Sequence, residues 1–316
     1  MAGDLASVGT PTPGPGAFRA IAPAWVAADL AGRPGPSDAG VASVHAAVVN
    51  LTVAAWPHLL MVAGPSVYRG PSSVGLTEAE FAEVRSWLTA GADVRYAPGA
   101  LALTLRGTSL QVSLEGPAAS FAPPPAFDVV PAVCRAGLPA ALEALRAAGP
   151  DDLSSTLLGC GPLDDPFAAP IADAFPALVR ALVAGDEPGQ VEVVRRLAGV
   201  GYGSTPTGDD LIHGALVAAH YLIRSVPSRR LLRHLPPGVA RTTTPLGSHM
   251  IEIGTRGLTP DPVRGFLLDV LGGRSVDAAL RALDRMGADS GRAVAVGAIL
   301  TITALLDPAH EGGGTA

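Results

Sequence analysis

The densest group of residues that could do chemistry lies between positions 199 and 210, directly before an apolar helical stretch. Its chemistry-bearing residues are three alternating glycines, two threonines around a proline and a pair of carboxylates: Gly199, Gly201, Gly203, Thr205, Pro206, Thr207, Gly208, Asp209 and Asp210. Glycine permits positive φ and lets a ligand approach the main chain closely. Thr205 before Pro206 has the pattern of a helix start, with a hydroxyl cap and then proline. The sequence therefore predicts a loop whose N–H groups, at a helix N-terminus, bind an anion.

The paired aspartates set this segment apart from a simple phosphate loop, because two carboxylates repel a bare phosphate. They are explained if Mg²⁺ bridges acid and anion, or if they accept hydrogen bonds from NH2 groups of a ligand. The structural alternative is that acids at a helix N-terminus suit the dipole, by ~0.3–1 kcal/mol each. We predict catalytic roles for Asp209, Asp210 and Thr207, and the two aspartates are optional ligands of Mg²⁺. The predicted binding residues of the loop are Gly199, Gly201, Gly203, Thr205 and Gly208.

Three further segments carry residues that could contact the same ligand. Ser290 and Gly291 precede the last apolar helix, where they could cap it or add a second set of main-chain donors. Ser248 lies in the hydroxyl-rich run 242–249, which could reach a ligand or form a capped turn. His45 and Asn50 lie on an apolar strand, where buried polar groups need partners, supplied by the protein or by a ligand. All five residues are candidates for substrate binding.

Covalent catalysis and a zinc site find little support in the chain. No serine lies in a nucleophile elbow, and no Cys–His pair is close in sequence. His213 and His220 share a helical face, but two ligands are too few for a zinc site. His213 is either an acid–base group next to Asp210 or a core histidine with internal partners.

The composition excludes several classes of function. All 22 basic residues are arginine, so chemistry that needs lysine is excluded, including a pyridoxal phosphate Schiff base and a Walker-type loop. A net charge of −6 without a basic run argues against a nucleic-acid surface. Cys134 and Cys160 lack metal-ligand spacing and indicate thiols of a reducing compartment. No signal-peptide pattern is present, and the longest apolar stretch is too short for a bilayer. We therefore expect a soluble cytoplasmic protein without membrane or nucleic-acid partners.

Changes in composition divide the chain into four segments. We expect a disordered N-terminus over residues 1–16, a β-rich domain over 17–125, a helical domain with the Gly-rich site over 126–307, and a disordered tail over 308–316. The prolines at 123–125 mark the boundary between the two domains. Because 48% of the residues are hydrophobic and 16% are charged, a sizeable core is expected.

The two central segments differ in their hydrophobic period. In the first, we expect strands over 41–53, 59–63, 100–105 and 109–114, a hairpin turn at 107–108 and one helix over 77–88, with a capping box of Thr77 and Glu80. In the second, we expect helices over 129–148, 171–184, 190–197, 209–224, 262–271, 276–286 and 291–306. Such segregated runs indicate an α+β fold. The helices that start at Asp209 and Gly291 are apolar nearly all round, which predicts a place at the centre of a bundle.

The loop residues also resemble a known family. The pattern Gly199-x-Gly201-x-Gly203-x-Thr205-Pro206-x-Gly208-Asp209-Asp210 is similar to the signature of the AllH-type subunit of oxamate carbamoyltransferase. The early strand with His45 and Asn50, the segment from Thr243 to Ser248, and the Ser290-Gly291 helix start agree with it. The resemblance extends from about residue 41 to 306. Two departures stand out: Thr207 occupies a serine position, and Arg292 with Ala293 follows where the family carries an aspartate.

The resemblance implies carbamoyl transfer in the salvage of purine (allantoin) nitrogen: oxalurate and phosphate give oxamate and carbamoyl phosphate. It also implies partner protein subunits. The loop would then hold the phosphate, and Asp209 or Asp210 would accept from the NH2 group or ligate Mg²⁺. Two other functions stay open: a non-catalytic subunit that binds a small anion and organises partner enzymes, and a Mg²⁺-dependent phosphotransferase.

Overall fold

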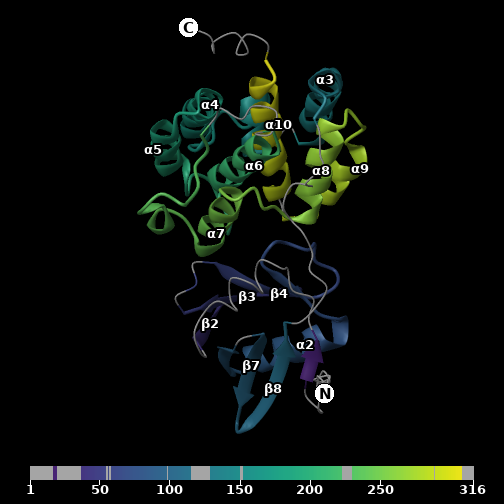
Figure 1. Ribbon diagram of the computed structural model, residues 1–316, viewed down its shortest axis with the longest axis vertical. Helices are drawn as coiled ribbons and strands as arrows, with labels where there is room; N and C mark the ends of the chain where they lie inside the picture. Colours follow the sequence, from purple (N-terminus) through teal and green to yellow (C-terminus); the bar gives the residue numbers. More distant parts are fainter. Residues whose placement is uncertain are drawn as a thin grey trace, which may run out of the picture. The chain divides into compact units, whose positions relative to one another are not determined.

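The computed structural model describes residues 17–19, 37–54, 56, 58–97, 99–114, 129–149, 152–222, 230–287 and 289–307. The chain divides into two compact units, a β-rich unit (1–56, 60–67 and 72–119) and a helical unit (57–59, 68–71 and 120–316). Strands precede helices in chain order, which confirms the predicted α+β class (Figure 1). The segments expected to be disordered, 1–16 and 308–316, and the prolines at 123–125 lie outside the described residues.

One sheet organises the described part of the β-rich unit, with the strand order β1-β8-β7-β6-β2-β3-β4-β5. Neighbours from β8 to β3 are antiparallel, whereas β1 pairs with β8, and β5 with β4, in parallel. The strands are β1 Ala17–Arg19, β2 Ser37–Val44, β3 Val48–Val53, β4 Leu59–Ala63, β5 Ser73–Gly75, β6 Asp93–Ala97, β7 Ala100–Leu105 and β8 Thr108–Ser113.

Two hairpins of this sheet, β2–β3 and β7–β8, bear on the predictions. The stretch 41–53 is two strands and not one, because the chain reverses between β2 and β3, where His45 N–H donates to Val48 O at 2.8 Å. The turn residues are alanines, which carry no turn signal. Between β7 and β8, Arg106 and Gly107 have φ of 51° and 82°, as a type I′ turn requires. The turn therefore lies at residues 106–107, one residue before the predicted position 107–108.

Helix α2 (Glu78–Thr89) interrupts the strands as predicted, and its apolar residues belong to the core of the β-rich unit. The Thr77 side chain accepts from Glu80 N–H, and the Glu80 carboxylate accepts from Thr77 N–H at 2.9 Å. This is the predicted capping box. Phe81, Val84 and Leu88 on its inner face are buried.

The described helices of the helical unit are α3 Pro131–Ala148, η1 Leu153–Leu158, α4 Ala168–Ala184, α5 Glu187–Leu197, α6 Thr207–Leu222, η3 Val239–Arg241, α7 Pro245–Gly254, α8 Asp261–Leu271, α9 Asp277–Leu283 and α10 Ser290–Leu305. The predicted helices are present, with ends shifted by a few residues. Helix α7 and the short helices η1 and η3 were not predicted as elements. No helix among the described residues is both long and apolar enough to cross a bilayer.

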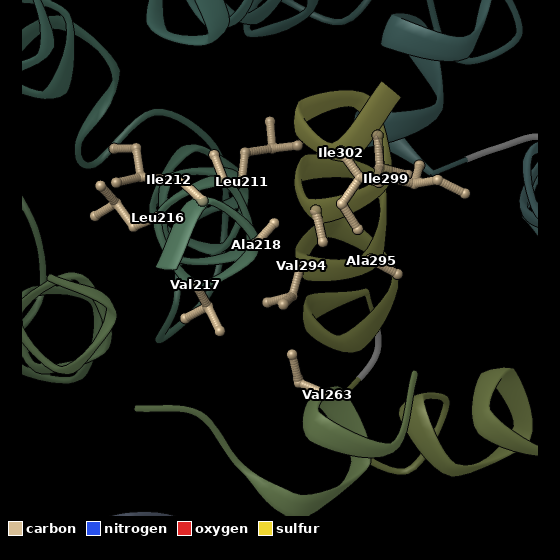
Figure 2. Packing of buried hydrophobic residues seen from close by; sticks show 14 of the residues in the cluster. Leu211, Ile212, Leu216, Val217, Ala218, Val263, Val294, Ala295, Ile299 and Ile302 are labelled. Atoms are coloured by element: carbon tan, nitrogen blue, oxygen red, sulfur yellow. The ribbon is translucent and has the colours of Figure 1, made fainter. Parts of the chain in front are cut away.

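Helices α6 and α10 form the centre of this unit, as their uniform apolarity predicted (Figure 1). Figure 2 shows Leu211 and Ala218 of α6 pointing toward α10, and Val294 of α10 pointing toward α6. The two backbones approach closely at two glycines. A Cβ on Gly214 would lie 2.1 Å from Val294 O, and one on Gly297 would lie 2.4 Å from Leu211 O. This contact gives the segment before α6 a rigid base.

Candidate functional site

The loop between α5 and α6 (198–206) contains the three alternating glycines, and all three adopt positive φ. A Cβ on Gly199 would lie 2.0 Å from Thr242 O, and one on Gly201 would lie 2.7 Å from Thr207 N. Gly203, with φ of 88°, has nothing within 4 Å of that position. Packing within the protein therefore requires two of these glycines, and only Gly203 has open space on its Cβ side.

Gly208, in the first turn of α6, is also required by packing. Its Cβ would lie 2.1 Å from Leu197 O at the end of α5, and its N–H donates to Val200 O at 2.8 Å. The glycine lets α6 begin directly against the preceding helix, which holds the loop between two fixed ends.

Asp209 is fully buried and holds the base of the loop. Its Oδ1 accepts Gly199 N–H at 2.8 Å, and its Oδ2 accepts the Thr243 hydroxyl in a short hydrogen bond. A Cβ on Gly247 would lie 1.9 Å from Oδ2, so only glycine fits there. Because both carboxylate oxygens are engaged, this side chain joins the loop to the segment before α7.

Asp210, the next residue in the chain, is also buried and has different partners. The hydroxyls of Thr205 and Ser290 hydrogen-bond with it and lie 2.6 Å from each other. The expected cap at Thr205 is therefore wrong. Helix α6 begins at Thr207, and the Thr205 hydroxyl is engaged by the start of α10 because that helix lies against α6.

Three helix N-termini meet at this loop. Helix α6 follows it directly, Ser290 at the start of α10 bonds to Thr205, and Thr244, the N-cap of α7, donates to Ser204 O. Each N-terminus carries about half a positive charge. Among the described hydrogen bonds, none uses the main-chain N–H groups of residues 201–205. The arrangement offers several amide donors and a positive field in one place, which suits a small anion.

Burial raises the pKa of both aspartates. The pKa of Asp209 rises to about 6, because desolvation outweighs the hydrogen bonds from Thr243 and Gly199. The pKa of Asp210 rises well above its ordinary value through desolvation, and the negative charges of Asp209 and Asp152 add to the effect. The raised pKa of Asp210 favours its protonated form, in which the carboxyl can donate a hydrogen bond or a proton.

The remaining predicted residues divide between the two units. Thr207 is buried in the first turn of α6, and Gly291 starts α10 against the end of α9, where a Cβ would lie 2.1 Å from Leu283 O. Ser248 lies in the first turn of α7, but no described hydrogen bond joins its hydroxyl to the loop. His45 and Asn50 lie in the β-rich unit, at the turn after β2 and on β3 respectively.

His45 and Asn50 do come together with each other. The His45 ring nitrogen Nε2 lies 3.0 Å from Ser43 Oγ, and Asn50 Nδ2 donates to the same oxygen at 2.9 Å. The protein itself therefore supplies the partner of the Asn50 amide nitrogen. Its Oδ1 is buried without a hydrogen-bond partner among the described residues.

His213, the histidine nearest to the paired aspartates in sequence, has protein partners at both ring nitrogens. Nδ1 donates to Met250 O at 2.7 Å, and Nε2 lies 2.9 Å from the Thr259 hydroxyl. Burial lowers its pKa to about 4, so the ring is neutral. Of the two alternatives for His213, an acid–base group or a core histidine with internal partners, the geometry matches the second.

Sequence reasoning missed three residues around the loop. Thr243 was seen only as part of a hydroxyl-rich run, although it binds Asp209. Burial raises the pKa of Tyr68 to about 12, and the charge of the nearby Asp210 adds to the effect. Asp152 also acts on Asp210. Tyr68 and Asp152 are distant in the chain, and no spacing rule connects them with the loop.

A magnesium ion would find few protein ligands here. No group of three or more His, Cys, Asp or Glu side chains in the described part of the chain is placed to hold a metal ion. Both Asp209 oxygens already accept protein donors. A Mg²⁺ ion at the aspartates would have to take most of its ligands from water and from a bound phosphate, as this ion often does.

Comparison with known proteins identifies the segment that carries this geometry. Residues 197–302 match the model of a family described as oxamate carbamoyltransferase subunit AllH. The matched segment starts at the end of α5 and stops within α10, so it contains the loop and all three helix N-termini. No curated protein and no solved structure matched the chain. The resemblance predicted from the Gly-rich loop is thereby confirmed: residues 197–302 of this chain are similar to the AllH family.

Proposed function

We propose that this chain is an AllH-like component of a carbamoyltransferase, and that the loop 198–206 binds carbamoyl phosphate or phosphate together with a small carboxylate or amide. The family description supports the carbamoyl-transfer role. The observation that carries the proposal is the meeting of three helix N-termini around main-chain N–H groups that no described hydrogen bond uses, within the segment that matches the family model.

The two aspartates have different tasks in this proposal. Asp209 organises the loop, because the protein already occupies both of its oxygens. Asp210 faces the ligand with the Thr205 and Ser290 hydroxyls, and its raised pKa leaves it with a proton to give. Transfer from oxalurate to phosphate forms a bond from a phosphate oxygen to the carbamoyl carbon and breaks the carbon–nitrogen bond. The departing nitrogen needs a proton, which Asp210 supplies as a general acid.

The main-chain N–H groups of the loop bind the anionic groups in this proposal. They hold the phosphate in position and stabilise the oxyanion of the tetrahedral intermediate, so that no covalent nucleophile is needed. Thr207 and the glycines act through this backbone arrangement, and Ser290 and Gly291 add the start of α10.

Calorimetric titration with phosphate, carbamoyl phosphate and oxamate, with and without Mg²⁺, tests the proposal. The Asp209→Ala/Asp210→Ala variant should lose binding, because both the loop anchor and the ligand-facing carboxyl are removed. Asp210→Asn separates the two effects, since it keeps the shape and should retain phosphate while losing turnover. Asp164→Ala changes an exposed acid and should bind as the wild type does. Unchanged binding in the double variant would refute a ligand site at the loop.

A second candidate function follows from the word subunit in the family description. In that case the chain binds the anion and organises partner enzymes of a cytoplasmic complex in purine nitrogen catabolism. Turnover by the purified chain favours the catalytic role. Binding without turnover, with activity only after partner proteins are added, favours the organising role. Strict Mg²⁺ dependence together with nucleotide binding would instead indicate a phosphotransferase.

A further inference from the structure

Asp152 is a buried carboxylate to which the proposed function gives no role. The residue is 5% exposed. Oδ1 accepts Ser154 N–H at 2.7 Å and caps η1, whereas Oδ2 has no hydrogen-bond partner among the described residues. A buried carboxylate oxygen without a partner destabilises the folded protein. Such an atom is expected to find its partner in a molecule that binds there.

The surroundings place this carboxylate at the start of α10, beside the candidate site. Asp289 and Arg292, which flank Ser290, both act electrostatically on Asp152. The charge of Asp152 in turn raises the pKa of Asp210. The packing agrees, since η1 lies against both α6 and α10.

The Arg292 side chain packs against the chain segment that precedes η1 and Asp152. A Cβ on Gly149 would lie 2.0 Å from its Nη1, so the guanidinium lies directly over the chain that leads into η1. Its Nη2 donates to Asp284 Oδ1 at 3.2 Å, and the Ser155 hydroxyl holds Gly149 O at 2.5 Å. Burial raises the pKa of Asp152, while its hydrogen bonds from Ser154 and the positive charge of Arg292 oppose the rise.

We infer that Asp152 lines the ligand site and that its Oδ2 accepts an N–H from the amide or carbamoyl group of the ligand. The inference rests on the proposed function: the helix N-termini take the anionic end, and Asp152 takes the NH2 end. A ligand with CH3 in place of NH2 would leave Oδ2 unpaired and bind less tightly. Asp152 lies outside the segment that matches the family model, so this recognition would be added by the preceding part of the chain.

Two pairs of nearly identical molecules test this inference. Carbamoyl phosphate and acetyl phosphate differ only by NH2 against CH3, and so do oxamate and pyruvate. The wild type should bind the NH2 member about tenfold more tightly, because the CH3 member would leave a buried acceptor unpaired. Asp152→Asn keeps the oxygen that caps η1 and replaces Oδ2 by a donor. This variant should lose the preference while its binding of inorganic phosphate stays unchanged.

Asp186→Asn is the matched control. Asp186 caps α5 with its Oδ1, which accepts Gly189 N–H at 3.1 Å, and it lies at the end of α5 opposite to the loop. This variant should keep the preference for NH2 ligands. Thermal unfolding of each variant confirms that the fold is retained.

Three results would overturn the inference. If Asp152→Asn keeps the preference, the inference is wrong and the proposed function stands. If Asp152→Asn weakens the binding of all ligands equally and lowers the melting temperature, Asp152 has a structural role only. If the wild type binds neither phosphate nor carbamoyl phosphate, the proposed function fails and the inference fails with it.

Discussion

The helical unit and the β-rich unit bury polar groups in different ways. Among the described residues, the buried carboxylates and imidazoles all belong to the helical unit: His58, Asp152, Asp209, Asp210, His213, His249 and Glu252. The buried polar residues of the β-rich unit are neutral: Asn50, Ser72 and Ser73. Burying an ionisable group is costly unless the fold supplies partners or shifts its pKa. The contrast agrees with the proposed site in the helical unit, whereas the core of the sheet is mainly apolar.

The origin of the difference lies in the helix ends. A helix presents several N–H donors at its N-terminus, and three such ends meet around Asp209 and Asp210. Most of the sheet's main-chain groups are satisfied by neighbouring strands, and its side chains alternate between a packed and an open face. Donors for a buried charge are thus available in one unit and scarce in the other.

The largest effect is expected where the helical unit brings two backbones together. Gly214→Ala would place a Cβ 2.1 Å from Val294 O, which neither helix can avoid without moving. We expect a loss of about 3 kcal/mol in the free energy of unfolding, measured with urea.

The control for Gly214 is a helical glycine with open space. Gly265 in α8 has nothing within 4 Å of its Cβ position, so Gly265→Ala should stabilise the protein by about 0.5–1 kcal/mol. Equal effects of the two substitutions would show that close packing of α6 and α10 is not what requires glycine.

The second prediction concerns the pH dependence that a buried carboxyl imposes. The pKa of Asp209 is about 6 in the folded protein, against about 3.9 in an unfolded chain. The folded state therefore binds the proton more tightly, and its stabilising contribution is fully present below about pH 4 and lost as pH rises through about 6. The free energy of unfolding should fall by up to about 3 kcal/mol across this window, and Asp209→Asn should abolish that component.

Buried histidines give the opposite trend and must be subtracted. The pKa values of His213 and His249 are lowered to about 4 and about 3 by burial, so their contribution is lost as pH falls below about 6.5. The difference between the wild type and Asp209→Asn, measured by urea unfolding from pH 4 to pH 8, isolates the aspartate. Parallel curves would contradict the assignment.

The third prediction tests the anchor between the loop and α7. Thr243→Val removes the hydroxyl that donates to Asp209 Oδ2 and leaves a buried oxygen unpaired. The expected cost is about 1–3 kcal/mol, with weaker phosphate binding because the loop is less well held. Thr243→Ser keeps the hydroxyl and should behave much as the wild type in both measurements. If the valine variant matches the serine variant, the hydrogen bond does not support the loop.

The smallest effect is expected in the β-rich unit. Thr77→Ala removes the capping box of α2 and should cost about 1 kcal/mol without any change in ligand binding. Thr89, at the exposed end of the same helix, provides the control, and Thr89→Ala should be neutral or slightly stabilising. Loss of phosphate binding in Thr77→Ala would mean that the two units do not divide structure and chemistry as proposed.

Much of the local structure could be predicted because its causes are local. The capping box at Thr77, the apolar character of α6 and α10, and the order of strands before helices depend on residues a few positions apart. The β2–β3 reversal was missed because its alanines carry no turn signal, and the cap at Thr205 was wrong because Ser290, 85 residues away, engages the hydroxyl.

By itself the sequence determined the α+β class, the central helices and the resemblance of the segment that holds the loop to the AllH family. Tertiary structure alone decided which groups meet at that loop: Thr243 and Gly247 at Asp209, Ser290 at Asp210, and Asp152 beside them. The physical reason is that a buried charge takes its partners from whichever elements pack against it. Those elements are brought together by the apolar faces of helices far apart in the chain, and no spacing in the sequence records that contact.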